Sequence, residues 1–330
     1  MTQDTDLVAT LLRTAGHRVV PPRHVYEATL AVAQTALERK LRARMQRRIG
    51  LRFAAGLLLM IGIAALLIDV QREPPADAAR VVRIVGAAER STTDDSWLPF
   101  GDTVAIGAGT RLRTLERSGL GLTLRDGSSL RLAANTEIAL VASDAVHLTI
   151  GKLYVDTGTD SADESTLRIL TPVGTTRDLG TRFEVRFRDG QYRLRVRDGR
   201  VLLERDGKEL RSSTGEELTL DPSGAVSRSR IAPHAAVWRW AEDLASPPSV
   251  DGEPLVVLLD WVARETGREI RYASPELEDR VRITVLHGHL AGLAPLDALA
   301  VMLATTNFEH VLRDDGTILI RPRNVSPRRP

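Results

Sequence analysis

The chain of 330 residues contains no cysteine. No disulfide can therefore stabilise any part of it, and thiol chemistry and cysteine-based metal sites are excluded. Aromatic residues make up only 4% of the chain. Its folded parts must be held together by buried aliphatic cores.

Motifs for catalysis are also lacking. No phosphate-binding loop and no dinucleotide fingerprint occurs, and Arg117-Ser118-Gly119 lacks the preceding glycine that a nucleophile elbow needs. His287 and His289 could place two imidazoles on one face of a strand, but no third ligand is evident, and a loop is the simpler interpretation. Acidic residues are scattered, as on solvated strands. We expect no enzyme, no cofactor and no metal.

A long apolar run is present instead. Residues 53–68 carry no charged or strongly polar side chain, and the stretch 51–70 would span about 30 Å as a helix, which is the thickness of a bilayer core. A buried helix of a soluble core is the alternative, but the run has no polar face. We predict a membrane anchor whose apolar side chains include Phe53, Leu57, Leu58, Ile61, Ile63, Leu66 and Ile68.

Basic residues before this run set its predicted orientation. Residues 1–52 hold ten basic and four acidic side chains, a net charge of +6, whereas the whole chain carries +2. Under the positive-inside rule the N-terminus is cytoplasmic. Contact with anionic lipid head groups is the favoured role of the basic stretch, and direct nucleic-acid binding is not expected. The topology-determining residues are Arg44, Arg47, Arg48 and Arg52.

A cleaved signal peptide is the competing interpretation of the run. Ala76-Asp77-Ala78 has the form of a cleavage site. The run, however, begins far from the N-terminus, is slightly long for a signal sequence and ends ten residues before Ala78. An uncleaved anchor is favoured.

The segment 1–50 before the anchor is expected to be helical. One short helix would end at Gly16, and a second, beginning near Arg23, shows apolar residues at spacings of three and four. Too few large apolar side chains are present for an independent core. The segment is either an amphipathic stalk or a docking segment for a cytoplasmic protein.

After a linker at 71–80, residues 81–230 alternate apolar and polar residues in short runs. Such period-two runs, separated by turn residues, predict an all-β domain of sandwich, barrel or solenoid type. Asp-Gly pairs beginning at 126, 189, 198 and 206 suit tight hairpins. The Arg, Thr and Glu side of each strand is expected to face solvent. The predicted strands are 81–85, 110–114, 120–124, 129–132, 137–140, 147–150, 152–155, 166–170, 182–187, 192–196 and 200–204.

An ordered set of motifs in this domain resembles the FecR-type domain, the extracytoplasmic part of bacterial membrane regulators of iron-responsive sigma factors. The set begins with Gly101-Asp102 and the stretch 109–114, continues through 122–128 and 151–155, and closes with 196–201. Turns are expected at Pro172 and Gly174 and at Gly180, followed by a strand with Phe183 and Val185 inward. The most specific motif positions, to which we assign a structural role, are Thr171, Pro172, Gly174, Gly180, Thr181, Phe183 and Val185.

Residues 231–253 are expected to form a helical linker. A helix over 233–245 has Pro233 in its first turn and ends before Pro247-Pro248. Trp238 and Trp240 cannot share one helix face. One of them should be buried, and packing within the chain is favoured over contact with a partner.

Residues 254–322 are expected to form a small α+β domain, and residues 323–330 are expected to form a disordered tail. Helices are expected at 255–266 and 296–303, packed on a sheet of strands at 269–272, 281–285, 308–312 and 317–320. The apolar spacing and the position of this domain resemble the STN module, which occurs in secretins, TonB-dependent receptors and FecR-type proteins. The candidate partner-binding residues are Leu255, Trp261, Leu296 and Leu299.

These resemblances imply a single-pass inner-membrane signal transducer with periplasmic C-terminal domains. The STN-like domain would contact the signalling domain of a TonB-dependent outer-membrane receptor, and the cytoplasmic segment would regulate an extracytoplasmic-function sigma factor. Regulators of this type usually carry tryptophan in that segment, and residues 1–52 contain none. The alternative is a membrane-anchored periplasmic scaffold without sigma-factor output.

Overall fold

The computed structural model describes Thr14 and residues 77–92, 96–99, 105–158 and 167–323. The chain divides into two compact units, Met1–Glu73 and Pro74–Pro330. In the described part, no helix combines the length and apolar character needed to cross a bilayer. The predicted span at 51–70, its anchor and arginine residues, and the N-terminal helices lie outside the described residues and stay predictions.

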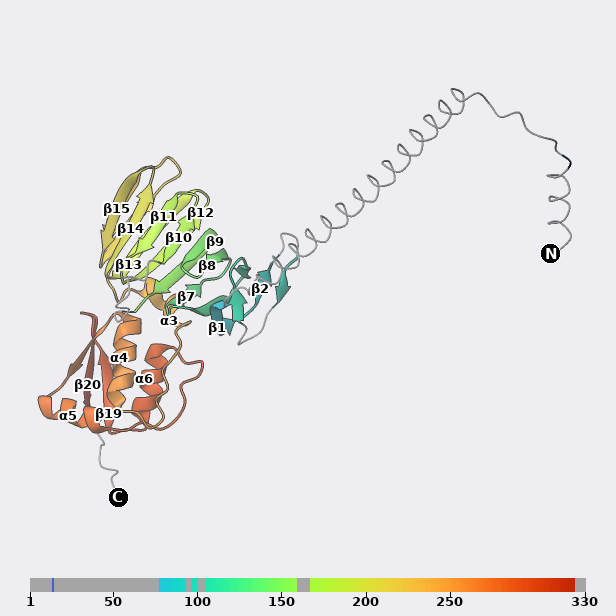
Figure 1. The fold of residues 1–330 in the computed structure, drawn as a ribbon. Helices are drawn as coiled ribbons and strands as arrows, with labels where there is room; N and C mark the ends of the chain where they lie inside the picture. The colour runs from blue at the N-terminus through green and yellow to red at the C-terminus, as the bar shows by residue number, and fades with distance from the viewer. Residues whose placement is uncertain (1–13, 15–76, 93–95, 100–104, 159–166, 324–330) are drawn as a thin grey trace, which may run out of the picture. The chain divides into compact units, whose positions relative to one another are not determined.

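Two β-sheets make up the first part of the second unit (Figure 1). Sheet A runs in the order β4 (Ala105–Gly107), β1 (Asp77–Val85), β6 (Gly119–Leu124), β7 (Ser129–Leu132), β9 (Ala145–Asp156), β12 (Arg182–Arg188), β13 (Gln191–Asp198), β16 (Glu216–Leu220) and β17 (Val226–Arg230). Sheet B runs in the order β3 (Leu98–Pro99), β2 (Ala88–Ser91), β5 (Arg111–Thr114), β8 (Glu137–Ala142), β9, β10 (Arg168–Thr171), β11 (Gly174–Asp178), β14 (Arg200–Arg205) and β15 (Lys208–Ser213).

Strand β9 belongs to both sheets. Its first half pairs with β8 and, in parallel, with β10, and its second half pairs with β7 and β12. The change occurs at Gly151, whose φ of +109° disfavours other residues and whose added Cβ would lie 2.5 Å from the Thr136 Cα. The prediction of two strands at 147–150 and 152–155 is therefore wrong, because one bent strand covers both.

One apolar core lies between the sheets. It takes buried Leu, Val and Ile side chains from both of them, as the alternating pattern predicts. Leu122 and Leu194 come from sheet A and Leu112 and Leu203 from sheet B, and all four are fully buried. The mostly β character predicted for this part of the chain is confirmed.

The Asp-Gly pairs form hairpins at three of the four predicted places. Asp189-Gly190 and Asp206-Gly207 have positive φ at both residues, as a type I′ turn requires. Asp126-Gly127 lies in the loop between β6 and β7, which pair with each other. The hairpin predicted at Asp198-Gly199 is wrong, because the chain there leaves β13 in sheet A and enters β14 in sheet B.

The C-terminal part is a small α+β unit with its own core. It contains α4 (Leu255–Thr266), β18 (Glu269–Tyr272), α5 (Pro275–Ile283), α6 (Pro295–Ala304), β19 (Phe308–Leu312) and β20 (Thr317–Pro322). Strand β20 is central, parallel to β18 and antiparallel to β19. Buried side chains from α4, α5, α6 and the sheet form one apolar cluster.

The strand predicted at 281–285 is wrong, because its first half belongs to helix α5. Ser274 caps this helix by accepting a hydrogen bond from the Leu277 backbone N–H, and Pro275 occupies the first turn. Leu277 and Val281 are four residues apart and both buried. The helical start signals outweigh the short alternation of Val281 to Val285.

Candidate functional site

The outer face of sheet A is not the solvated surface that the alternation predicts. Arg131, Tyr154 and Glu184 occupy directly opposite positions on β7, β9 and β12, and each is at most 2% exposed. Arg197 on β13 is 1% exposed. The prediction of solvent-facing polar residues is wrong here, because residues 231–266 cover this face.

Trp238 anchors the covering segment. Residues 236–242 form a 3₁₀ turn, η1 (Ala236–Trp238), and a short helix, α3 (Arg239–Glu242), in place of the longer helix predicted. The fully buried Trp238 ring packs edge-on to Tyr154, with centroids 6.0 Å apart, and its Nε1 donates to the Ala232 carbonyl. The expected burial of one tryptophan against the chain itself is confirmed.

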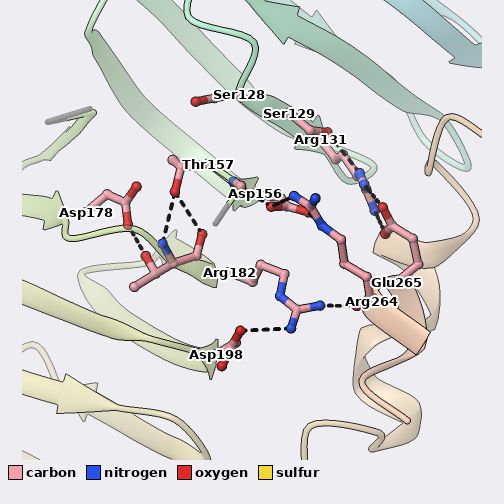
Figure 2. Close-up of polar contacts among 12 residues, drawn as sticks. Ser128, Ser129, Arg131, Asp156, Thr157, Asp178, Arg182, Asp198, Arg264 and Glu265 are labelled. Atoms are coloured by element: carbon pink, nitrogen blue, oxygen red, sulfur yellow. Dashed lines mark hydrogen bonds and ion pairs between the residues drawn. The ribbon is translucent and has the colours of Figure 1, made fainter. Parts of the chain in front are cut away.

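A buried ion pair joins sheet A to α4. Arg131 donates through Nη1 and Nη2 to the two carboxylate oxygens of Glu265, at 2.7 and 2.9 Å (Figure 2). Its Nη1 also donates to the Ala241 carbonyl. The side chains are 3% and 7% exposed. Burial alone would lower the pKa of Arg131, but the charge and hydrogen bonds of Glu265 outweigh it and raise the pKa. Arg131 therefore stays charged at physiological pH.

Arg264, the residue of α4 before Glu265, forms a second ion pair, in which α4 supplies the cation and sheet A the anion. Arg264 donates to both carboxylate oxygens of Asp156 at the end of β9, at 2.5 and 3.2 Å, and its carbonyl accepts from Arg182 (Figure 2). Burial alone would raise the pKa of Asp156, but Arg264 holds it below its usual value. Since neighbouring residues of α4 carry opposite charges, a shift of the helix would bring like charges together.

A third ion pair fixes the segment before α4. Arg197 lies where β13 bulges against β12 between Arg182 and Phe183. It donates to the Pro233 carbonyl at 2.7 Å and to Glu242 at 2.6 Å, and its guanidinium lies over the Trp238 ring. We call these three ion pairs, Arg131–Glu265, Arg264–Asp156 and Arg197–Glu242, the junction.

Trp240 closes the edge of the junction. Its Nε1 donates to the buried carboxylate of Glu184 at 2.9 Å, and the Lys152 ammonium lies 4.2 Å from its ring centroid. The second tryptophan therefore also packs within the chain.

An open polar cleft of about 500 Å³ lies beside the two α4 ion pairs. Trp261 of α4 lines it, and the Trp261 Nε1 is buried without a hydrogen-bond partner among the described residues. The other lining residues are Thr123, Asp126, Gly127, Ser129, Arg131, Asp156, Thr157, Gly158, Ser246, Arg264 and Glu265.

The FecR-type motif residues lie at turns and in the core. Thr171 to Gly174 forms the β10–β11 turn, with Pro172 exposed, and Gly180 has a φ of +81°. Phe183 and Val185 are fully buried, which is the orientation that the alternation predicts.

Thr181 ties the start of β12 to its neighbours. Its Oγ1 donates to Asp178, and its backbone N–H donates to Thr157 Oγ1 at 2.9 Å (Figure 2). Burial raises the pKa of Asp178. These contacts connect the end of β11 and the end of β9 to β12, which is a structural role.

The predicted partner-binding residues separate into two groups. Leu255 and Leu299 are fully buried in the α+β core and offer no surface to a partner, because both lie on the apolar faces of their helices. Leu296 is partly buried against that core, and Trp261 lines the cleft. No group of three or more candidate metal ligands occurs in the described part of the chain, and His287 lies in a loop beside Asp251.

Sequence reasoning missed the junction, although one signal was available. Glu265 continues the stripe of Leu258 and Val262 at helical spacing, so it places a charge on the buried face of α4. Such a charge requires a buried partner. Arg131 gave no comparable signal, since it alternates like any solvent-facing strand residue.

Residues 110–202 match the family described as FecR protein. No curated protein matches the chain. Two crystal structures of a candidate anti-sigma factor from Parabacteroides distasonis, at 1.65 and 2.50 Å resolution, are similar to it at 16% identity. They cover 64% and 65% of this chain and 97% and 99% of their own, with TM-scores of 0.35 and 0.34, which are too low to support an argument about function. By the family match, residues 110–202 are a FecR domain.

Proposed function

We propose that the protein is a single-pass inner-membrane signal transducer that regulates an extracytoplasmic-function sigma factor. The segment 1–50 would bind the sigma factor in the cytoplasm, and the FecR domain and α+β unit would lie in the periplasm. The α+β unit would receive the signal from the signalling domain of a TonB-dependent receptor.

The observation that carries this proposal is the junction. Two oppositely charged side chains of α4 contact the outer face of the FecR domain: Glu265 is buried there against Arg131, and the half-exposed Arg264 binds the buried Asp156. A buried pair tolerates little displacement, because separating the two charges leaves each without a partner in a low-dielectric site. A partner that binds the α+β unit therefore acts directly on the FecR domain.

The chain before the FecR domain supports the second half of the proposal. The apolar stretch 53–68 follows a strongly basic segment, which is the arrangement expected of an anchor with a cytoplasmic N-terminus. A change in the FecR domain would reach the cytoplasm through this single connection.

A reporter assay tests the proposal in cells. Transcription from a promoter dependent on the sigma factor that co-purifies with the full chain is measured in strains carrying the full chain, a gene deletion, or Glu265→Arg. We expect the deletion to change the basal level and Glu265→Arg to abolish the response to the inducer at normal protein abundance. Glu269→Arg is the control, since Glu269 is 63% exposed and pairs with Arg271 on β18, away from the junction.

The cytoplasmic contact is tested separately. Residues 1–48 are replaced by an unrelated basic anchor, and sigma-factor co-purification is measured with the original and the swapped chain. We expect the swap to remove both co-purification and regulation. An unchanged phenotype after the swap would support a periplasmic scaffold and contradict the sigma-factor proposal.

A further inference from the structure

Three cationic side chains lie directly opposite one another on the outer face of sheet A, beside the Trp240 edge of the junction. Arg186 on β12 faces Lys152 on β9 and Arg193 on β13 in the strand register. We call these three residues the cationic row. Like charges at directly opposite positions destabilise a sheet, so the row requires an explanation beyond the stability of the fold.

The carboxylates near the row are already shared. Glu184 is fully buried, and its oxygens lie 3.9 Å from Lys152, 3.6 Å from Arg193 and 3.3 Å from Arg195, while also accepting from Trp240. Glu217 pairs with Arg195 at 2.5 Å, so two carboxylates face the four cations Lys152, Arg186, Arg193 and Arg195. Burial lowers the pKa of Lys152 and of Arg193, and the neighbouring arginines add to the effect.

The row also has unused hydrogen-bond donors. Within the described ranges, Arg186 forms no hydrogen bond or ion pair, and the Nε–H of Arg193 is buried without an acceptor. A buried donor without a partner is costly. An anionic ligand that supplies acceptors would satisfy these groups and relieve the repulsion among the cations.

The row is partly buried. The Lys152 and Arg193 side chains are only 26% and 20% exposed. Trp240 lies against Lys152 at one border, and at another the Arg188 guanidinium donates to the Asn135 carbonyl at 3.1 Å. A single extended chain can bring acidic side chains against these partly buried cations between their neighbours, whereas the flat surface of a bilayer would meet the exposed neighbours first.

We propose that the cationic row binds an extended acidic segment of a partner protein, whose carboxylates accept hydrogen bonds from Arg186 and Arg193. This site lies on the FecR domain itself. It goes beyond the proposed function, since it does not involve the receptor contact of the α+β unit or the sigma factor.

Peptide binding to the full chain in a neutral detergent tests the proposal. The probe is a short labelled peptide of alternating Asp and Thr residues, and the matched peptide carries Asn for Asp. We expect saturable binding of the acidic peptide only, weakened by at least about tenfold in Arg186→Glu and in Arg193→Gln. The control is Arg211→Glu on β15, where the side chain is 82% exposed, and it should bind normally.

Thermal unfolding of the same variants separates binding from folding. Arg186→Glu places a carboxylate between two cations, so its midpoint should equal or exceed that of the original chain while peptide binding is lost. Equal binding of both peptides, or undiminished binding by both row variants, would overturn the proposal. So would binding that depends on Arg186 but occurs only to phosphatidylglycerol vesicles, since the partner would then be a lipid surface.

Discussion

Replacing Glu265 by leucine leaves the Arg131 guanidinium buried beneath α4 without its counter-charge. Arg131 keeps its hydrogen bonds to the Ala241 carbonyl and to Ser129 Oγ, but neither acceptor carries a charge. Removing one partner of a buried ion pair lowers the free energy of unfolding by about 3–5 kcal/mol. Because the Arg131 side chain is 3% exposed, solvent screening reduces this loss little.

The double variant Arg131→Met with Glu265→Leu gives the opposite expectation. Removing both charges removes both desolvation costs, and apolar replacements of similar volume are often neutral or stabilising. We therefore expect the free energy of unfolding of the double variant to lie within about 1 kcal/mol of that of the original chain, or to exceed it. The Arg264–Asp156 pair offers a comparison: Arg264 is 44% exposed but Asp156 is only 3% exposed, so Arg264→Leu also leaves a buried carboxylate without its counter-charge and should cost several kcal/mol.

Urea unfolding followed by tryptophan fluorescence measures these differences. All four tryptophans lie in the described part of the chain, and Trp238, Trp240 and Trp261 belong to the segment that covers sheet A. Their emission therefore reports on the junction. A loss below about 1 kcal/mol for Glu265→Leu, or a double variant as unstable as the single one, would refute the reasoning.

Three further predictions concern the fold. Burial lowers the pKa of His310, so its contribution to stability is complete above about pH 6.5 and is lost as the pH falls toward the lower folded value; urea unfolding between about pH 7.5 and 5.5 should show this loss, and His310→Gln should reduce it. Gly151→Ala should cost several kcal/mol because its Cβ would meet Thr136, whereas Gly127→Ala, with a φ of +87° but open space around its Cβ, should cost about 1 kcal/mol; similar losses would contradict the steric argument. Ser274→Ala should destabilise α5 by about 1 kcal/mol in thermal unfolding, and no change would show that the cap is dispensable.

Local patterns predict most of the two-sheet part of the chain. Alternation locates the longer strands, and the Asp-Gly turns at 189 and 206 follow from the need for positive φ at both residues. The strands that the patterns miss are short or polar. Strand β17, for example, is exposed at every residue and carries little apolar alternation.

The junction could not be predicted from the strands that build it. Arg131 and Glu184 read as solvated positions, since alternation shows only that they lie on the face opposite the core. The covering segment is separated from Arg131 by more than a hundred residues. Only Glu265, a charge on an apolar helical stripe, indicates from the sequence that a buried counter-charge exists.

Strand β9 gives the FecR domain a mechanical property. Asp156 at its end binds Arg264 of α4, and the same strand continues past Gly151 into sheet B, where β8 and β10 hold it. A displacement of α4 would act on Asp156 through the Arg264 ion pair, and the continuous backbone of β9 connects Asp156 to sheet B. Because the two sheets share β9, we expect a displacement of this strand in sheet A to move its partners β8 and β10 in sheet B as well.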